Sequence, residues 1–205
     1  MAQRMYIPCD SSTGFIEQFD GFFQLQDVGL SSLEPRDQSL QALLGRGEVQ
    51  RTQVIKQPDV LMLLYLLRDR YDGRVKRANW DYYEPPMDHD FGSSLGPPIH
   101  AALGAELGLT KKAYEHFVRA AWVDLDDLRG NTGDGVHAAS AGGLWQALVF
   151  GFGGLKLTPE GPKAWPRLPE HWERVTFRIC YRGRRFLFEL VQGKEGPVYP
   201  RALTP

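Results

Sequence analysis

Three polar stretches hold the residues that are best suited to chemistry. The first, DHDFGSSLGPPIH, places Ser93 and Ser94 directly before a predicted helix. Backbone N–H groups and the helix dipole favour an anion there, and the small residue Gly92 lets a phosphate come close. The alternative is that one serine only caps the helix, and the spacing by itself favours that alternative.

The second stretch, GNTGDGVHAAS, has the same form. His137 and Ser140 fall in the first turn of a predicted helix that is rich in Ala and Gly. The imidazole of His137 can donate a hydrogen bond to a phosphate, but a capping or packing histidine is the simpler interpretation. Two such loops favour convergence on one anion, although spacing does not establish that they meet.

The third stretch is the pair Lys56–Gln57, which precedes the most apolar predicted helix. Pro58 disfavours a helix interior, so the helix either starts at Pro58 or is kinked there. A start at Pro58 puts Lys56 and Gln57 on the turn before the helix. Their side chains can donate hydrogen bonds to several sugar hydroxyls, and the alternative is that both are ordinary surface residues.

The other polar patterns are weaker candidates for a catalytic or metal-binding site. The acids of DLDD, residues 124–127, end a predicted helix, where acids are unfavourable, and we interpret them as ordering the loop beside Arg129 rather than binding a metal. No zinc-ligand spacing, P-loop or EF-hand pattern occurs, so no metal ligand and no cofactor is predicted. A glycosidase needs two acids across a cleft, and context singles out none of the available ones. These acids are Glu17, Asp81, Glu84 and Asp88.

The composition is that of an ordinary globular protein of 205 residues. Lys plus Arg number 24 and Asp plus Glu 25, a balance that gives no bulk electrostatic reason to expect nucleic acid or an anionic membrane as a partner. The two cysteines form no disulfide framework, and the N-terminus has no apolar signal-like run. The apolar run VLMLLYLL is too short to span a bilayer. We therefore expect a cytoplasmic protein.

Apolar periodicity predicts that helices dominate the first three quarters of the chain. Residues 1–35 are predicted to be irregular, with FIEQFDGFFQL pressed against a core formed elsewhere. Residues 79–97 are expected to form the longest loop between helices. The predicted helices span residues 37–44, 53–71, 97–107, 111–128 and 136–150.

The composition changes near residue 154. A Pro-rich stretch, residues 157–172, is followed by VTFRICYRGRRFLFELVQG, whose alternating apolar residues around a YRGR turn predict a β-hairpin. The predicted fold class is therefore mainly α, followed by a small C-terminal β domain. The predicted domains are residues 1–153 and residues 154–205.

The ordered set of segments resembles a known family. QFDGFFQL, VIKQPDVLMLLYLL, NWDYYEP, SSLGPPIHAALGAELG and DLDDLRGNTGDGVHAASAGGLWQALVFGFGGL occur in the order found in the C-terminal half of glycoside hydrolase family 65. This family contains the inverting maltose, kojibiose, nigerose and trehalose phosphorylases. The closing segment, TPEGPKAWPRLPEHWERVTFRICYRGRRFLFEL, is similar to the C-terminal β domain of the family.

The resemblance implies the later helices of an (α/α)6 catalytic barrel, followed by a small β-sandwich-like domain. It also implies that Lys56 and Gln57 contact the glucosyl group of an α-linked disaccharide. Ser93, Ser94 and His137 would bind inorganic phosphate, which is a co-substrate, and no cofactor is implied. Phosphate would attack the anomeric carbon opposite the leaving sugar, invert that centre and release β-glucose 1-phosphate.

Several features depart from the family pattern. The general-acid glutamate of the family lies upstream of the Lys-Gln pair, and neither its segment nor the large N-terminal β-sandwich is found here, so no catalytic residue is assigned. Pro58 stands where Ala is usual, and the serine turn reads DHDFGSSLGP instead of HDSSLSP. General-acid catalysis is typically worth about 10²–10⁴-fold in rate. We therefore expect negligible activity from this polypeptide alone.

Three roles remain open at this point. In the first, the chain is the C-terminal half of an α-glucoside phosphorylase, natural or truncated, whose partner is the N-terminal half on a separate chain or another copy of itself. Alternatively it belongs to an inverting hydrolase of the same family, in which water replaces phosphate. A third role is that of a non-catalytic remnant that binds a sugar or a partner chain.

Overall fold

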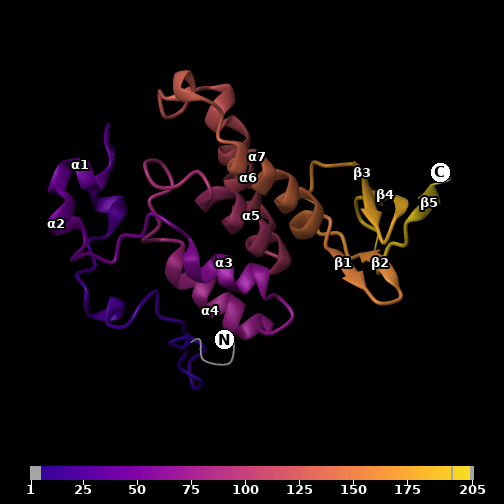
Figure 1. Ribbon diagram of the computed structural model, residues 1–205, viewed down its shortest axis with the longest axis horizontal. Helices are drawn as coiled ribbons and strands as arrows, with labels where there is room; N and C mark the ends of the chain where they lie inside the picture. Colours follow the sequence, from indigo (N-terminus) through magenta and orange to yellow (C-terminus); the bar gives the residue numbers. More distant parts are fainter. Residues whose placement is uncertain (1–5, 195, 204–205) are drawn as a thin grey trace.

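The computed structural model describes residues 6–194 and 196–203, in which helices form the middle of an elongated molecule and a small β domain lies at the C-terminal end (Figure 1). Within these residues, no helix is long and apolar enough to cross a membrane. The helical segments are η2 (Phe22–Gln24), η3 (Leu30–Leu33), α1 (Leu40–Leu44), α2 (Arg46–Val49), α3 (Asp59–Leu66), α4 (Gly73–Tyr83), α5 (Gly96–Glu106), α6 (Thr110–Leu125), η4 (Thr132–Asp134), α7 (Ala138–Gln146) and the π-helical η5 (Ala147–Phe152). The strands are β1 (Leu155–Thr158), β2 (Gly161–Ala164), β3 (Arg174–Tyr181), β4 (Arg184–Val191) and β5 (Arg201–Leu203).

The segment before α1 is mostly irregular and lies against the helices, as predicted. Ile16 and Phe22 are buried in the main helical core. The backbone of the segment is fastened to α4, because the N–H of Ile16 donates to the Asn79 side chain at 2.9 Å and the Tyr83 hydroxyl donates to the Ile16 carbonyl at 2.6 Å. The aromatic stretch before residue 35 therefore finds its core in later helices.

Helix α3 is shorter than the predicted helix over residues 53–71. It begins at Asp59, with Pro58 as its N-cap, and ends at Leu66. The start at Pro58 was one of the two predicted alternatives. The residues before it are extended instead of helical, since Ile55 forms a parallel bridge with Met87. The start at Pro58 is therefore confirmed, because backbone pairing holds the residues before it, and the predicted end at residue 71 was wrong.

Helix α4 was not predicted, and the expected loop over residues 79–97 begins inside it. The Asp72 side chain caps this helix by accepting a hydrogen bond from the N–H of Val75 at 2.9 Å. Trp80 and Tyr83, three residues apart, are buried, while most other side chains of the helix are polar. The narrow apolar face explains why a polar and aromatic sequence was misinterpreted as a loop.

Helix α5 is the centre of the helical part and is buried over most of its length. The predicted single helix over residues 136–150 is instead α7 followed by η5. A Cβ atom on Gly151 would lie 2.9 Å from the Ala102 Cα atom, so the π-helical turn brings its backbone directly against α5. Helix α6 ends at Leu125, three residues before its predicted end.

The β domain contains two antiparallel sheets. β1 pairs with β2, and β3, β4 and β5 form a three-stranded sheet in that order. The β3–β4 pair, in which Phe177 lies opposite Phe188, confirms the predicted hairpin. The Pro-rich stretch was not predicted to hold strands, yet it contributes half of β1 and all of β2. Phe188 and Leu190 share a core with Phe152 of η5, which joins the β domain to the helices.

Candidate functional site

The serine loop, which we define as residues 88–94, is fastened along the strand-like segment before α3. The N–H of Asp88 donates to the Ile55 carbonyl at 3.0 Å, and the N–H of Ser93 donates to the Lys56 carbonyl at 2.9 Å. These two bonds hold the backbone of the Lys56–Gln57 turn directly beside the serine loop. Two segments singled out in the sequence therefore meet in the fold.

Gly92 allows this close approach. A Cβ atom at this position would lie 2.2 Å from the Asp88 carbonyl oxygen and 3.2 Å from the Lys56 carbonyl oxygen. Both neighbours are backbone atoms, which cannot move away as a flexible side chain would. The glycine is thus required by the tight turn and by the contact with the Lys56–Gln57 turn.

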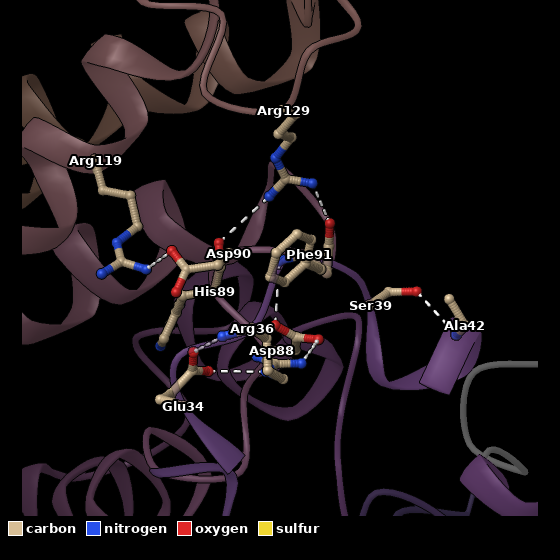
Figure 2. Close-up of polar contacts among 11 residues, drawn as sticks. Glu34, Arg36, Ser39, Ala42, Asp88, His89, Asp90, Phe91, Arg119 and Arg129 are labelled. Atoms are coloured by element: carbon tan, nitrogen blue, oxygen red, sulfur yellow. Dashed lines mark hydrogen bonds and ion pairs between the residues drawn. The ribbon is translucent and has the colours of Figure 1, made fainter. Parts of the chain in front are cut away.

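Three arginines from different parts of the chain surround the serine loop (Figure 2). The guanidinium of Arg36 donates to both carboxylate oxygens of Asp88, at 3.0 and 3.2 Å, and the two side chains are only 3% and 6% exposed. Arg119 forms an ion pair with Asp90. Arg129 donates to the carbonyl oxygen of Gly92. The loop is therefore held by side chains as well as by backbone pairing.

The charges around the loop differ in burial and in pairing. The hydrogen bond with Asp88 raises the pKa of Arg36, so this pair stays ionised. Asp88 also accepts a hydrogen bond from the N–H of Phe91 at 3.1 Å. Burial lowers the pKa of Arg129, whose hydrogen-bond partners are neutral carbonyl oxygens. Among residues 6–194 and 196–203, no carboxylate accepts a hydrogen bond from Arg129, although the charges of Asp88 and Asp90 act on it. The Arg129 guanidinium therefore remains available to an anion nearby.

Two cavities flank the serine loop. The larger, about 530 Å³, is lined by Lys56 and Gln57. The smaller, about 270 Å³, is lined by Ser94, Arg119 and Arg129 among others. Phe91 contributes to both cavities. The predicted sugar-contacting pair and the predicted phosphate-contacting serine thus lie on two sides of one loop.

The two serines are in different positions. The Ser93 hydroxyl accepts a hydrogen bond from the N–H of Leu95 at 3.2 Å, so it stabilises the turn that leads into α5. Its own proton can still be donated to another group. The Ser94 hydroxyl takes part in no hydrogen bond among residues 6–194 and 196–203, and Ser94 faces the smaller cavity.

His137 lies at the start of α7, where it is the N-cap residue. Its N–H donates to Asp124 Oδ2 at 2.8 Å, and its Nδ1 donates to Asp124 Oδ1 at 2.5 Å. The hydrogen bond from His137 lowers the pKa of Asp124 below its ordinary value. His137 lines neither cavity beside the serine loop. The structure therefore brings Lys56 and the serines together and leaves His137 in a neighbouring loop.

The acids at the end of α6 order that neighbouring loop, which we call the histidine loop and define as residues 126–137. Asp127 accepts a hydrogen bond from the N–H of Thr132 at 3.0 Å, and Asp124 holds His137 at the other end. This agrees with the interpretation of the DLDD acids as loop-ordering residues. Arg129, which the same segment carries, reaches back to the serine loop.

Sequence reasoning missed most residues that hold the serine loop. Arg36 and Asp88 are 52 positions apart, and nothing near either residue indicates that they pair. Arg119 lies on α6, where a charged residue between apolar positions is typical of a solvated helix face. Only Arg129 carried a local signal, because it follows the acids of the DLDD run.

Comparison with known proteins matches almost the whole chain to one protein family. A family model described as the central catalytic domain of glycosyl hydrolase family 65 matches residues 1–146, and one for the C-terminal domain of the same family matches residues 153–195. A kojibiose phosphorylase from Thermoanaerobacter brockii is 40% identical over 94% of this chain and 25% of its own length. A maltose phosphorylase from Bacillus subtilis is 37% identical over 94% of this chain and 26% of its own length.

A solved structure has the same fold. A putative kojibiose phosphorylase from the human microbiome matches with a TM-score of 0.85 and 32% identity over 93% of this chain and 26% of that chain. The chain therefore spans about a quarter of the length of the proteins that it resembles. Helices followed by a small β domain are shared over almost all of the 205 residues.

Proposed function

The chain belongs to glycosyl hydrolase family 65, and we propose that it carries the glucosyl-contacting and phosphate-contacting part of an inverting α-glucoside phosphorylase. Its relatives include kojibiose and maltose phosphorylases that match at least 94% of the chain. The observation that carries the proposal is the backbone hydrogen bond between Ser93 and Lys56. It supports a site in which the sugar and the phosphate meet at the serine loop.

In the proposed reaction, Lys56 and Gln57 bind the glucosyl group of an α-linked disaccharide from the larger cavity. Ser94 donates a hydrogen bond to inorganic phosphate, and Ser93 and His137 add further donors. A phosphate oxygen forms a bond to the anomeric carbon while the bond to the leaving sugar oxygen breaks on the opposite face. The product is β-glucose 1-phosphate, and its anomeric centre is inverted.

The nearby arginines favour the same anion. The smaller cavity has Arg119 and Arg129 in its wall, together with Ser94. Asp90 already pairs with Arg119, whereas Arg129 has only carbonyl acceptors. A phosphate in this cavity would therefore meet the Arg129 guanidinium, whose hydrogen-bond acceptors are neutral carbonyl oxygens, and the Ser94 hydroxyl. Charge-assisted bonds of this kind are roughly twice as strong as neutral ones.

The leaving sugar oxygen needs a proton, and we propose that the donor is a glutamate outside these 205 residues. Without it, the leaving group would depart as an alkoxide, which lowers the rate by about 10²–10⁴-fold. The 205-residue chain by itself is therefore proposed to bind phosphate without turning over disaccharide. In the active enzyme, the remaining part of the catalytic domain would supply the acid and the second wall of the cleft.

Turnover and binding test the two parts of the proposal separately. The purified 205-residue chain is incubated with phosphate and, in turn, kojibiose, maltose and trehalose, and the release of β-glucose 1-phosphate and of glucose is measured. We expect neither product at a measurable rate. Turnover by the chain alone would contradict the assignment of the acid to another segment. Glucose release without phosphate would point to hydrolysis instead.

Binding of inorganic phosphate is then measured by calorimetry. Ser94→Ala and His137→Asn are each expected to weaken binding by about 10- to 150-fold, since a hydrogen bond to a charged group contributes about 1.5–3 kcal/mol. His171→Asn, which changes an exposed histidine in the β domain, is the matched control and should bind normally. Equal binding by the wild type and both site variants would exclude these residues as phosphate ligands.

A further inference from the structure

Three of the five histidines of the chain lie together beside the serine loop. His89 belongs to that loop, His100 to α5 and His116 to α6. The ring centroids are 4.6 Å apart for His89 and His100, 4.4 Å for His89 and His116, and 5.1 Å for His100 and His116. Each ring therefore touches the other two, and we call this group the histidine cluster.

Ring nitrogens of the cluster are enclosed without a hydrogen-bond partner. Among the described residues, both ring nitrogens of His89 and the Nε2 atom of His100 have none. His100 Nδ1 donates to the Gly96 carbonyl at 2.9 Å, so the proton of the neutral ring is on Nδ1 and Nε2 carries a lone pair. Enclosed polar atoms in proteins are nearly always paired with protein groups, water or ions, so these ring nitrogens have room for a further partner.

A carboxylate lies beside the histidine cluster. Glu84 Oε1 is 3.7 Å from His116 Nε2, and the side chain of His116 is only 9% exposed. Imidazole nitrogens and carboxylate oxygens are both common donors to divalent metal ions. The fold therefore brings donors of both kinds together in one place.

We propose that Glu84, His89 and His116 form a binding site for a single divalent transition-metal ion of the Zn²⁺ class. One donor atom of each residue lies within 4.8 Å of the other two. Zinc bonds of about 2.0–2.2 Å bring tetrahedral donors to roughly 3.4 Å from one another, so small side-chain rotations would complete the site. Two imidazoles and one carboxylate are a donor set that zinc accepts, with a fourth position for water.

The surroundings fit an ion of this kind. A cavity of about 210 Å³ reaches Glu84 and His89 from the surface, which provides access and room for a water ligand. On the inner side, Trp80 lies edge-on to His116, with ring centroids 6.2 Å apart, and restricts its rotation. Lys112 Nζ is 3.6 Å from Glu84 Oε2 and is half exposed, so it can move into solvent when an ion binds.

The inference is independent of the proposed function. His116 and Glu84 take no part in the proposed contacts with sugar or phosphate, whereas His89 also lines the smaller cavity. Glu84→Gln therefore tests the metal site without changing a residue of the phosphate cavity. The competing explanation is that ordinary water fills the space among the rings. Water would satisfy the nitrogens without selecting Zn²⁺, and this difference is measurable.

The test uses the untagged 205-residue chain, freed of metal by a chelator. Zn²⁺ is titrated by calorimetry, and Co²⁺ serves as a spectroscopic probe, because its visible absorption is strong in four- or five-coordinate sites and weak in octahedral ones. We expect one equivalent of Zn²⁺ and an intense Co²⁺ spectrum. Glu84→Gln and His89→Asn are each expected to weaken Zn²⁺ binding at least tenfold and to remove the Co²⁺ bands.

The control is His171→Asn, which removes an exposed imidazole outside the cluster and should bind one equivalent like the wild type. Near-ultraviolet circular dichroism of each apo variant shows whether it is folded, and Glu84→Gln keeps the size of its side chain for that reason. Absence of stoichiometric binding by the wild type would overturn the proposal. It would also be overturned if folded Glu84→Gln and His89→Asn bound Zn²⁺ as tightly as His171→Asn.

Discussion

The serine loop and the histidine loop look alike in sequence but are held in different ways. The serine loop is fastened by partners far away in the chain, including Arg36 and the Ile55–Lys56 backbone. The histidine loop is fastened mainly by its own flanks, through Asp124 and Asp127. In Figure 1 the segment between α6 and α7 extends away from the other helices, whereas the loop before α5 lies among them.

This difference suggests a division of roles. A loop with buried, long-range contacts opens only when much of the protein unfolds, and a loop with exposed, local contacts opens at little cost. The serine loop is therefore suited to be the fixed wall of the site. The histidine loop, which carries His137, depends less on the rest of the fold, and Arg129 joins it to the serine loop through the Gly92 carbonyl.

The largest expected effect comes from breaking the buried pair in the serine loop. Asp88→Ala leaves the Arg36 guanidinium, which is only 3% exposed, without its main partner. Removal of one partner of a buried ion pair typically costs about 3–5 kcal/mol, and we expect that loss in the free energy of unfolding measured with urea. Asp127→Ala in the histidine loop is the matched control. It should change the free energy of unfolding far less, because Asp127 is exposed. Equal losses would show that both loops are held alike.

A smaller loss in the free energy of unfolding is expected when a methyl group is added to a glycine of the serine loop. The same change in the histidine loop should have almost no effect. Gly92→Ala would place its Cβ atom 2.2 Å from the Asp88 carbonyl oxygen, so the backbone must shift. Overpacking of this kind costs roughly 1–3 kcal/mol. A Cβ atom on Gly133 meets nothing within 4 Å, and Gly133→Ala should stay within about 0.5 kcal/mol of the wild type. Thermal unfolding of both variants measures the difference, which would vanish if the serine loop adapted freely.

The sequence predicts a large part of the fold because most of its elements follow from local patterns. Apolar spacing located α5 and α6 to within a few residues, and alternation located the β3–β4 hairpin. Pro58 correctly indicated one possible start of α3. Helix α4 was missed because its buried face is narrow and its remaining residues are polar. Its stability depends on burial of Trp80, and local composition does not reveal that burial.

The arrangement of the site was harder to predict, because it depends on contacts between distant segments. Spacing and the family resemblance selected Lys56, Ser93 and His137, but spacing alone does not indicate which of them touch. The hydrogen bond between Ser93 and Lys56 spans 37 positions. The histidine cluster is built from a loop and two helices, and no zinc motif has that spacing. Such groups become visible only after the helices are packed.

The smallest and most local effect is expected in the histidine loop itself. Asp124→Ala removes both acceptors of His137, so the amides of residues 130–138 should exchange with solvent several-fold faster while the melting temperature stays nearly unchanged. Asp126→Ala, whose side chain has no hydrogen bond within the described part of the chain, is the matched control and should leave these exchange rates unaltered.

Amide exchange in the serine loop should be unaffected by Asp124→Ala if the two loops are held separately.

Lowering the pH is expected to speed amide exchange in the histidine loop of the wild type in the same way. The pKa of Asp124 is lowered by the hydrogen bond from His137, so its stabilising charge is present above the ordinary pKa of 3.8 and is lost only as the pH falls below that value. Loosening of the histidine loop between pH 7 and pH 5 would contradict this assignment. Faster exchange in both loops at once would mean that Arg129 couples them more strongly than their separate contacts indicate.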